Sequence, residues 1–209
     1  MTPRVLIAGA GGHAKVVADL VELSQPALTI AGFVQSGPST DDATFLGFPL
    51  VGELRTASLA HDVFVVAIGN NAIRRRVFEQ LLAAGDTPVS LAHPRSIVAR
   101  SSTLGAGAMV CAMAVVNPST VIGVNTILNT HCSIDHDCTI GNHVHIAPRV
   151  VLGGGITIGD GTLIGIGAAI RPGVRIGSGA LIGAGAVVVS DVPSGETVFG
   201  VPARPRSSR

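Results

Sequence analysis

The 209-residue sequence has no tryptophan and no tyrosine, and aromatic residues make up only 3% of it. Charged residues are also scarce, at 13%, and the formal net charge is only +1. A charge so close to zero predicts neither a nucleic-acid partner nor attraction to an acidic membrane surface. No run of about 18 uncharged apolar residues occurs, so no transmembrane helix is predicted.

The N-terminus also lacks the basic, apolar and small-residue regions of a signal peptide, because Arg4 leads directly into a short apolar segment and a glycine-rich turn. The cysteines are odd in number and lack zinc-finger spacing, which favours reduced thiols at Cys111, Cys132 and Cys138. These absences predict a soluble cytoplasmic protein.

What the sequence does have is a strict repeat of six residues. From Val98 to Val188 every sixth residue is a branched aliphatic, and glycine often follows it. This period matches neither the 3.6 residues of an α-helical turn nor a long alternating strand, and it is typical of a parallel β-helix. With three hexapeptides in each coil, the aliphatic side chains would point inward in three columns. A β-sandwich would not keep this register over so long a span.

The first 92 residues follow another pattern, in which short apolar strands alternate with helical segments and predict a small α/β domain. The segment GAGGHA at 9–14 fits the G-x-G-x-x-G/A motif, whose turn directs backbone N–H groups at a phosphate. An ordinary NAD site would also need an acid after the second strand, where Gln35 and Ser36 stand instead. The ligand site is expected at the turns 9–13, 34–37 and 69–71.

Four of the seven histidines lie within the segment HCSIDHDCTIGNHVH, residues 131–145. His136 is midway between two inward aliphatic positions, so it is expected at a corner or on an outward face. Asp135 and Asp137 flank it, and a carboxylate that fixes the tautomer of a histidine is the usual arrangement for a general base. Taken alone, the pattern favours a solvated polar edge over a catalytic histidine.

Two other kinds of chemistry could use the same segment. His143 and His145 could direct two imidazoles at a zinc ion, although no third ligand stands at a clear spacing. Cys132 and Cys138 lie close enough in sequence to His136 to suggest a thiol nucleophile, but packing is the favoured role for them. A metal-dependent hydratase and a non-catalytic scaffold therefore remain as alternatives.

Four segments in order resemble the NeuD/PglD-type bacterial sugar acetyltransferases, which belong to the hexapeptide-repeat acyltransferase superfamily. They are GAGGHAKVV near the N-terminus, AIGNNAIRRRV at 67–77, ILNTHCSIDHDCTIGNHVHIAP at 127–148 and VFGVPARP at 198–205. The resemblance implies an α/β Rossmann-like domain for nucleotide-sugar binding at 1–92. A left-handed parallel β-helix with a C-terminal cap would follow at 93–209. It also implies a homotrimer with active sites at the subunit interfaces.

The activity implied by the resemblance is acetyl-CoA-dependent N-acetylation of a nucleotide-linked amino sugar for surface glycan or polysaccharide biosynthesis. Acetyl-CoA would be the co-substrate and no metal would be needed. The alternative is O-acetylation of a sugar such as sialic acid. Relatives commonly carry two aspartates where Gln35 and Ser36 stand, so the nucleoside is left open.

The site residues are carried over motif by motif. His136 and Asp137 would be catalytic, as the base and the acid beside it. The acetyl-CoA contacts would be His145, Gly154, Ile166 and Ala184. The nucleotide-sugar contacts would be Gly11, Gly12, His13, Gln35, Ser36, Gly69 and Asn129. On the β-helix, His145 and Gly154 are expected one or two faces beyond His136.

Overall fold

The computed structural model describes residues 2–24, 28–35, 43–52 and 59–205. The chain divides into two compact units, Met1–Ala92 and His93–Arg209, and each unit has a core of its own. Ser36 lies outside the described residues. Within the described residues, no helix has the length and apolar character that crossing a membrane requires.

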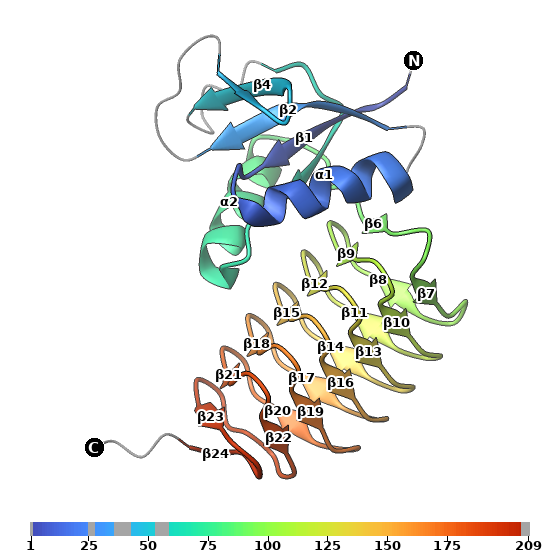
Figure 1. Ribbon diagram of the computed structural model, residues 1–209, viewed down its shortest axis with the longest axis vertical. Helices are drawn as coiled ribbons and strands as arrows, with labels where there is room; N and C mark the ends of the chain where they lie inside the picture. Colours follow the sequence, from blue (N-terminus) through green and yellow to red (C-terminus); the bar gives the residue numbers. More distant parts are fainter. Residues whose placement is uncertain (1, 25–27, 36–42, 53–58, 206–209) are drawn as a thin grey trace. The chain divides into compact units, whose positions relative to one another are not determined.

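The N-terminal unit is built on a five-stranded sheet in the order β3-β4-β2-β1-β5, in which only β3 runs antiparallel (Figure 1). A helix follows β1 and another follows β5, as alternating strands and helices predict. The elements are β1 (Arg4–Ala8), α1 (Gly12–Ser24), β2 (Thr29–Gln35), β3 (Thr44–Phe45), β4 (Phe48–Gly52), β5 (Val63–Val66), α2 (Asn71–Ala83) and β6 (Leu91–Ala92).

The register of this sheet places three strand ends side by side. Ala8, the last residue of β1, pairs with Val34 of β2 and with Val66 of β5. Because these strands are parallel, the turns that follow them open at one edge of the sheet, where ligands of such folds bind. α2 starts at this edge, and the Asn70 side chain caps it by accepting a hydrogen bond from the Ile73 N–H.

The second unit is a parallel β-helix with three faces, made mostly of two-residue strands (Figure 1). The first face contains β7 (Ile97–Val98), β10 (Val115–Val116), β13 (Ser133–Ile134), β16 (Val151–Leu152), β19 (Ala169–Ile170) and β22 (Val187–Val188). The second contains β8 (Thr103–Leu104), β11 (Val121–Ile122), β14 (Thr139–Ile140), β17 (Thr157–Ile158) and β20 (Arg175–Ile176). The third contains β9 (Met109–Val110), β12 (Ile127–Leu128), β15 (His145–Ile146), β18 (Leu163–Ile164), β21 (Leu181–Ile182), β23 (Thr197–Phe199) and β24 (Arg204–Pro205).

The aliphatic residues of the repeat form the inner columns, as predicted from their spacing. On the first face Val116, Ile134, Leu152 and Ile170 pair in register from coil to coil and are at most 4% exposed. Full burial of one such side chain stabilises the fold by about 1.5–3 kcal/mol relative to exposure. The period of six therefore reflects core packing on three faces.

Most corners between faces are tight turns with one residue in the left-handed backbone region. In the middle coils these residues are Asn125, His131, Asp137, His143 and Arg149, with φ between 53° and 62°, and in later coils glycine takes the position. Asparagine, aspartate and histidine tolerate this conformation better than other non-glycine residues. His131, Asp137 and His143 of the polar segment are thus corner residues, whereas His145 lies on a strand.

Candidate active site

His136 and Asp137 form the turn at the first corner, which we define as the turns that follow first-face strands. The inward residues Ile134 and Ile140 hold the chain on either side of this turn. The His136 side chain is 59% exposed, so its ring stands at the surface of the single chain.

The Asp137 carboxylate sets the tautomer of this histidine. His136 Nδ1 lies 2.7 Å from Asp137 Oδ2. Because an ionised carboxylate can only accept, Nδ1 carries the proton and Nε2 of the neutral ring is left with a lone pair. This is the arrangement of a general base whose orientation is fixed by its neighbour.

The same neighbours increase the proton affinity of the ring. The pKa of His136 is raised above its ordinary value, first by the hydrogen bond to Asp137 and next by the negative charge of Asp135. The raised pKa lies closer to neutral pH, and a histidine transfers protons most effectively when its pKa is near the working pH.

Gly154 lies against the His136 ring, one full coil further along the chain. A Cβ built on Gly154 would lie 2.7 Å from Cε1 and 2.8 Å from Nε2 of His136. Only glycine leaves room for the ring in this position. Gly154 therefore shares the first corner with His136, and the expectation that it lies one or two faces beyond was wrong. A residue 18 positions later returns to the same corner.

The backbone of this corner also offers a hydrogen-bond donor. Gly155 donates its N–H to the His136 carbonyl at 2.9 Å, whereas within the described chain the Gly154 N–H donates to no acceptor. An unused N–H beside the lone pair of His136 is the kind of group that stabilises an oxyanion.

Asn129 and His145 lie on a different part of the β-helix. His145 is on β15 of the third face, and Asn129 directly follows β12 of the same face. The Asn129 Nδ2 group donates to His145 Nε2 at 3.1 Å, so the proton of a neutral His145 is on Nδ1. The Asn129 Oδ1 accepts the Thr130 N–H at 2.8 Å, which orients the amide.

Ile166 and Ala184 occupy the third corner, defined as the turns that follow third-face strands, and both are exposed. The chain thus presents the predicted residues in two groups. His136, Asp137 and Gly154 are together at the first corner. His145, Asn129, Ile166 and Ala184 lie on the third face or corner, so one chain does not bring the two groups together.

The glycine turns of the N-terminal unit provide open space at the edge of its sheet. Gly11 precedes α1 and Gly12 begins it, and a Cβ on either residue would meet no atom within 4 Å. His13 follows in the first turn of α1, and its pKa is lowered to about 4 by burial and then by the charge of Arg74. His13 is therefore neutral at pH 7 and contributes no charge to a ligand there.

Arg74 is a residue of this edge that the sequence reasoning did not identify. Its side chain is fully buried, and Nη1 donates to the carbonyls of Ile68 at 3.1 Å and Gly69 at 3.3 Å. Arg74 therefore shapes the turn that contains the predicted residue Gly69. A clue was present in AIGNNAIRRRV, but three consecutive arginines gave no means of telling which one is buried. Gln35 ends β2 at the same edge and is half-buried.

The thiols have surroundings that suit packing. Burial raises the pKa of Cys111 and of Cys132 to about 12 in each case. Burial also raises the pKa of Cys138, whose Sγ lies 3.3 Å from the Gly153 carbonyl oxygen. A nucleophilic cysteine would need the opposite shift. Among the residues that the structure describes, no group of three or more His, Cys, Asp or Glu side chains is placed to hold a metal ion.

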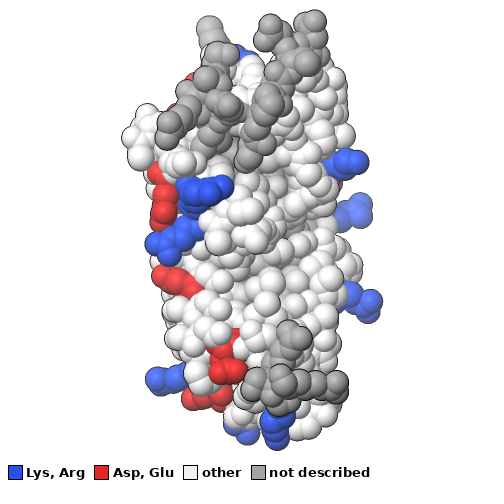
Figure 2. All heavy atoms as spheres, turned by 90° about the vertical axis from the view of Figure 1, so that its left-hand side faces the viewer, with Lys and Arg blue, Asp and Glu red and all other residues white. Residues whose placement is uncertain are grey.

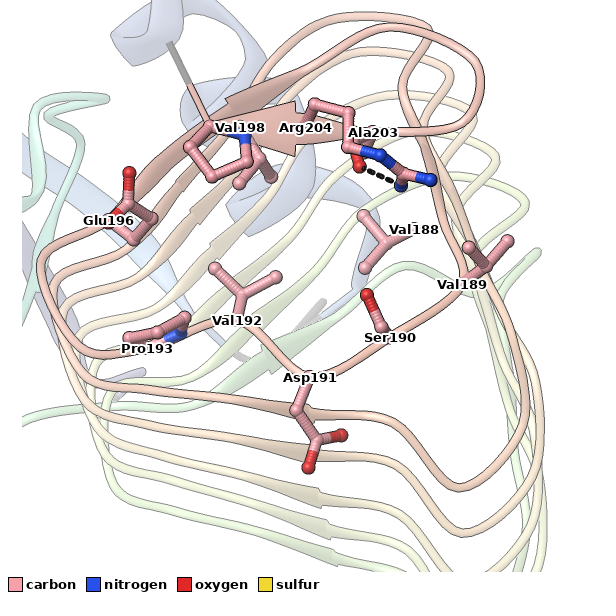
Figure 3. Close-up of a pocket in the computed structure, with 11 residues that line it drawn as sticks. Val188, Val189, Ser190, Asp191, Val192, Pro193, Glu196, Val198, Ala203 and Arg204 are labelled. Atoms are coloured by element: carbon pink, nitrogen blue, oxygen red, sulfur yellow. Dashed lines mark hydrogen bonds between the residues drawn. The ribbon is translucent and has the colours of Figure 1, made fainter. Parts of the chain in front are cut away.

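A cavity of about 420 Å³ lies at the C-terminal end of the β-helix and contains none of the predicted site residues. In Figure 3 Val188 and Val192 point toward the middle of the last coil, whereas Asp191 points away. Figure 2 shows a face that is mostly uncharged, with charged side chains mainly towards its edges.

Two family models match the chain. The PglD N-terminal domain matches residues 4–81, and the bacterial transferase hexapeptide (six repeats) matches residues 155–190. A curated relative, UDP-N-acetylbacillosamine N-acetyltransferase of Bacillus subtilis (strain 168), is 34% identical over 112 residues. That match spans 52% of this chain and 51% of the relative, about half of the relative's length.

Solved structures match over the whole chain. The acetyltransferase domain of PglB from Neisseria gonorrhoeae FA1090 is 39% identical with a TM-score of 0.89, covering 98% of this chain and 100% of that one. PerB from Caulobacter crescentus, solved with CoA and GDP-perosamine, is 36% identical with a TM-score of 0.89, covering 99% of each chain.

These matches confirm the expected fold, an α/β N-terminal region followed by a left-handed β-helix of hexapeptide repeats. The sequence resemblance, the fold and the solved relatives all indicate one family. The chain belongs to the NeuD/PglD-type sugar acetyltransferases of the hexapeptide-repeat superfamily.

Proposed function

We propose that the protein transfers the acetyl group of acetyl-CoA to the amine of a nucleotide-linked amino sugar, for surface glycan or polysaccharide biosynthesis. One observation carries the proposal: an exposed His136 whose Nδ1 is bound by Asp137 and whose ring lies against the Gly154 backbone. Relatives solved with acetyl-CoA, or with CoA and GDP-perosamine, support the two substrates. Acetyl-CoA and nucleotide sugars would be used in the cytoplasm.

His136 performs the proton transfers of the reaction. Nε2 takes a proton from the amine as the nitrogen attacks the thioester carbonyl carbon and the C–N bond forms. The Gly154 N–H binds the oxygen that becomes negative in the tetrahedral intermediate. The C–S bond then breaks, and the imidazolium returns the proton to the CoA thiolate. Asp137 stabilises the imidazolium between these steps, and no acyl-enzyme is formed.

A neighbouring subunit completes the site. His136 is on the first corner, whereas His145, Ile166 and Ala184 are on the third face and corner, so acetyl-CoA contacts from both groups require two chains. Exposed apolar side chains on both surfaces suit a subunit contact, among them Ile97 and Val151 of the first face and Met113 of the third corner. A homotrimer in which each first corner meets the next chain's third face satisfies this requirement.

The nucleotide sugar binds at the glycine turns of the N-terminal unit. Gly11 and Gly12 offer backbone groups and open space, and Arg74 shapes the turn that contains Gly69. Neutral His13 is available as a hydrogen-bonding group. Gln35 and Ser36 take the place of acids beside the nucleoside, and Asn129 contacts the sugar.

The test is the His136→Asn variant, assayed by CoA release with UDP-, GDP- and dTDP-linked 4-amino sugars and with free sialic acid. We expect the wild type to turn over one of the nucleotide amino sugars, and the variant to lose about 10²–10⁴-fold in kcat. Its oligomer and its affinity for CoA should be unchanged, because an exposed side chain is exchanged for a smaller one. Wild-type turnover of sialic acid alone, or a variant with normal kcat, would contradict the proposal.

A further inference from the structure

The N–H of the residue that begins each corner turn needs a partner outside the strand ladder. At three turns a side-chain oxygen from the next coil accepts this N–H and so caps the turn. Asn142 accepts from Val124, Asp160 from Asn142 and Ser194 from Ser178. At other turns proline removes the donor, as Pro118, Pro148 and Pro172 do.

His136 is capped in a different way, because the next coil has Gly154 at this position. Asp135, the residue before it, accepts the His136 N–H through Oδ1 at 2.8 Å. The same oxygen accepts a hydrogen bond from Asn117 Nδ2 of the preceding coil at 3.1 Å. The Asp135 carbonyl accepts a third hydrogen bond, from the Thr120 hydroxyl at 2.8 Å. Asp135 is thus anchored to the coil before it and holds the turn that carries His136.

The cap itself does not require a charge. Asn129 makes the same contact one corner earlier, where its neutral Oδ1 accepts the Thr130 N–H at 2.8 Å. An asparagine at position 135 could likewise accept both hydrogen bonds that Oδ1 of Asp135 receives. The negative charge of the Asp135 carboxylate is therefore not needed for the cap. The group beside this charge is the His136 ring.

We infer that Asp135, held by Asn117, is a second positioning residue of the acetyl-transfer site, which fixes the turn under His136 and places a second negative charge beside its ring. The inference rests on the proposed function of His136. Asp135 stabilises the imidazolium through space, whereas Asp137 does so through a hydrogen bond. The other titratable group at this turn is the Cys138 thiol, and the first-corner turns of the adjoining coils consist of Pro118 and Ser119 and of Gly154 and Gly155, which carry no titratable side chain.

The direction of the effect agrees with the charges around the ring. The charge of Asp135 raises the pKa of His136, after the larger contribution of the hydrogen bond to Asp137. Two charges a few ångströms apart in water change a proton affinity by about threefold. Because the active form of the base is neutral, a higher pKa moves the rise of activity with pH to higher pH.

The experiment compares pH profiles of kcat/KM for the wild type, Asp135→Asn and Asp160→Asn, in the full-length protein between about pH 5 and pH 9. Asp135→Asn keeps an acceptor for the His136 N–H and removes the charge, so the rise of activity should move to lower pH, corresponding to about threefold weaker proton binding. Asp160→Asn removes a capping carboxylate at another corner and should leave the profile unchanged.

A second readout does not depend on turnover. NMR titration of the His136 ring should show the same downward shift in Asp135→Asn. If the wild type transfers no acetyl group, the proposed function fails while this titration still tests Asp135. A profile and a titration that both match the wild type would reduce Asp135 to a structural cap and overturn the inference. An equal shift in Asp160→Asn would also overturn it, because the effect would then be general.

Discussion

Two side chains at the edge of the N-terminal sheet can carry a charge, although Arg74 is fully buried and His13 is half-buried. Arg74 satisfies part of its guanidinium with the carbonyls of Ile68 and Gly69, and its pKa is lowered by burial to about 10, so it stays charged at pH 7. The pKa of His13, lowered to about 4, makes this histidine neutral over the same range. At pH 7 Arg74 is therefore charged and His13 is neutral.

The His13 shift predicts how stability depends on pH. Because the pKa of His13 is near 4 in the folded state and 6.5 in the unfolded state, the unfolded state binds the proton first as pH falls. The folded state therefore loses stability, on the order of 3 kcal/mol, between about pH 6.5 and pH 4. Urea unfolding at several pH values should show this loss in the wild type and a smaller one in His13→Gln. Equal slopes in the two proteins would refute the prediction.

At the scale of one turn and its neighbouring coil, His136 and Gly154 act together. Gly154 has no positive φ, and the three atoms nearest to its missing Cβ all belong to the His136 ring. Gly155 is the opposite case, since its φ is +68° and its missing Cβ would meet no atom within 4 Å. Gly154 is thus required because a side chain there would collide with the His136 ring. Gly155 is required because its backbone has a positive φ.

These reasons predict opposite outcomes for two alanine variants. Gly154→Ala should displace the His136 ring and lower kcat by about 10- to 100-fold, since small misplacements are costly in catalysis. Its melting temperature should hardly change, because an exposed ring can move away. Gly155→Ala should lose roughly 1 kcal/mol of stability from backbone strain and keep most of its activity. Thermal unfolding and steady-state kinetics of both variants would separate the effects, and the reverse pattern would disprove the assignment.

At the scale of the whole molecule, the first and third corners of one chain are different edges of the β-helix. The proposed reaction, which uses His136 together with His145, would therefore use two chains. A heterologous ring closes this arrangement, because each chain then offers its first corner to one neighbour and its third face to the other.

Mixing two inactive variants tests the shared site. His136→Asn and His145→Ala should each be inactive alone. After unfolding and joint refolding at equal amounts, about a quarter of the sites should combine an intact His136 from one chain with an intact His145 from the next. We expect about that share of wild-type activity to return. Native mass spectrometry would show whether mixed oligomers have formed. If they have formed and no activity returns, both histidines belong to the site of one chain.

Much of this architecture follows from the sequence because its cause is local. A branched aliphatic at every sixth position decides which side chains point inward, and columns such as Val116, Ile134 and Leu152 pair in register as expected. The glycine turn before α1 and the flanking of His136 by two aspartates were equally visible, since neighbours in sequence remain neighbours in a short turn.

The tertiary structure decided the contacts that join residues far apart in the sequence. A coil of 18 residues returns Gly154 beneath His136 and brings Asn117 to Asp135, and the packing of α2 selects Arg74 as the buried member of three arginines. Coil stacking also placed Asn129 and His145 on another face from the base. The sequence alone therefore determined the repeat and the residues beside the base, because spacing along the chain sets the inward side. Which distant groups meet depends on how coils and helices stack, and that is a property of the folded chain.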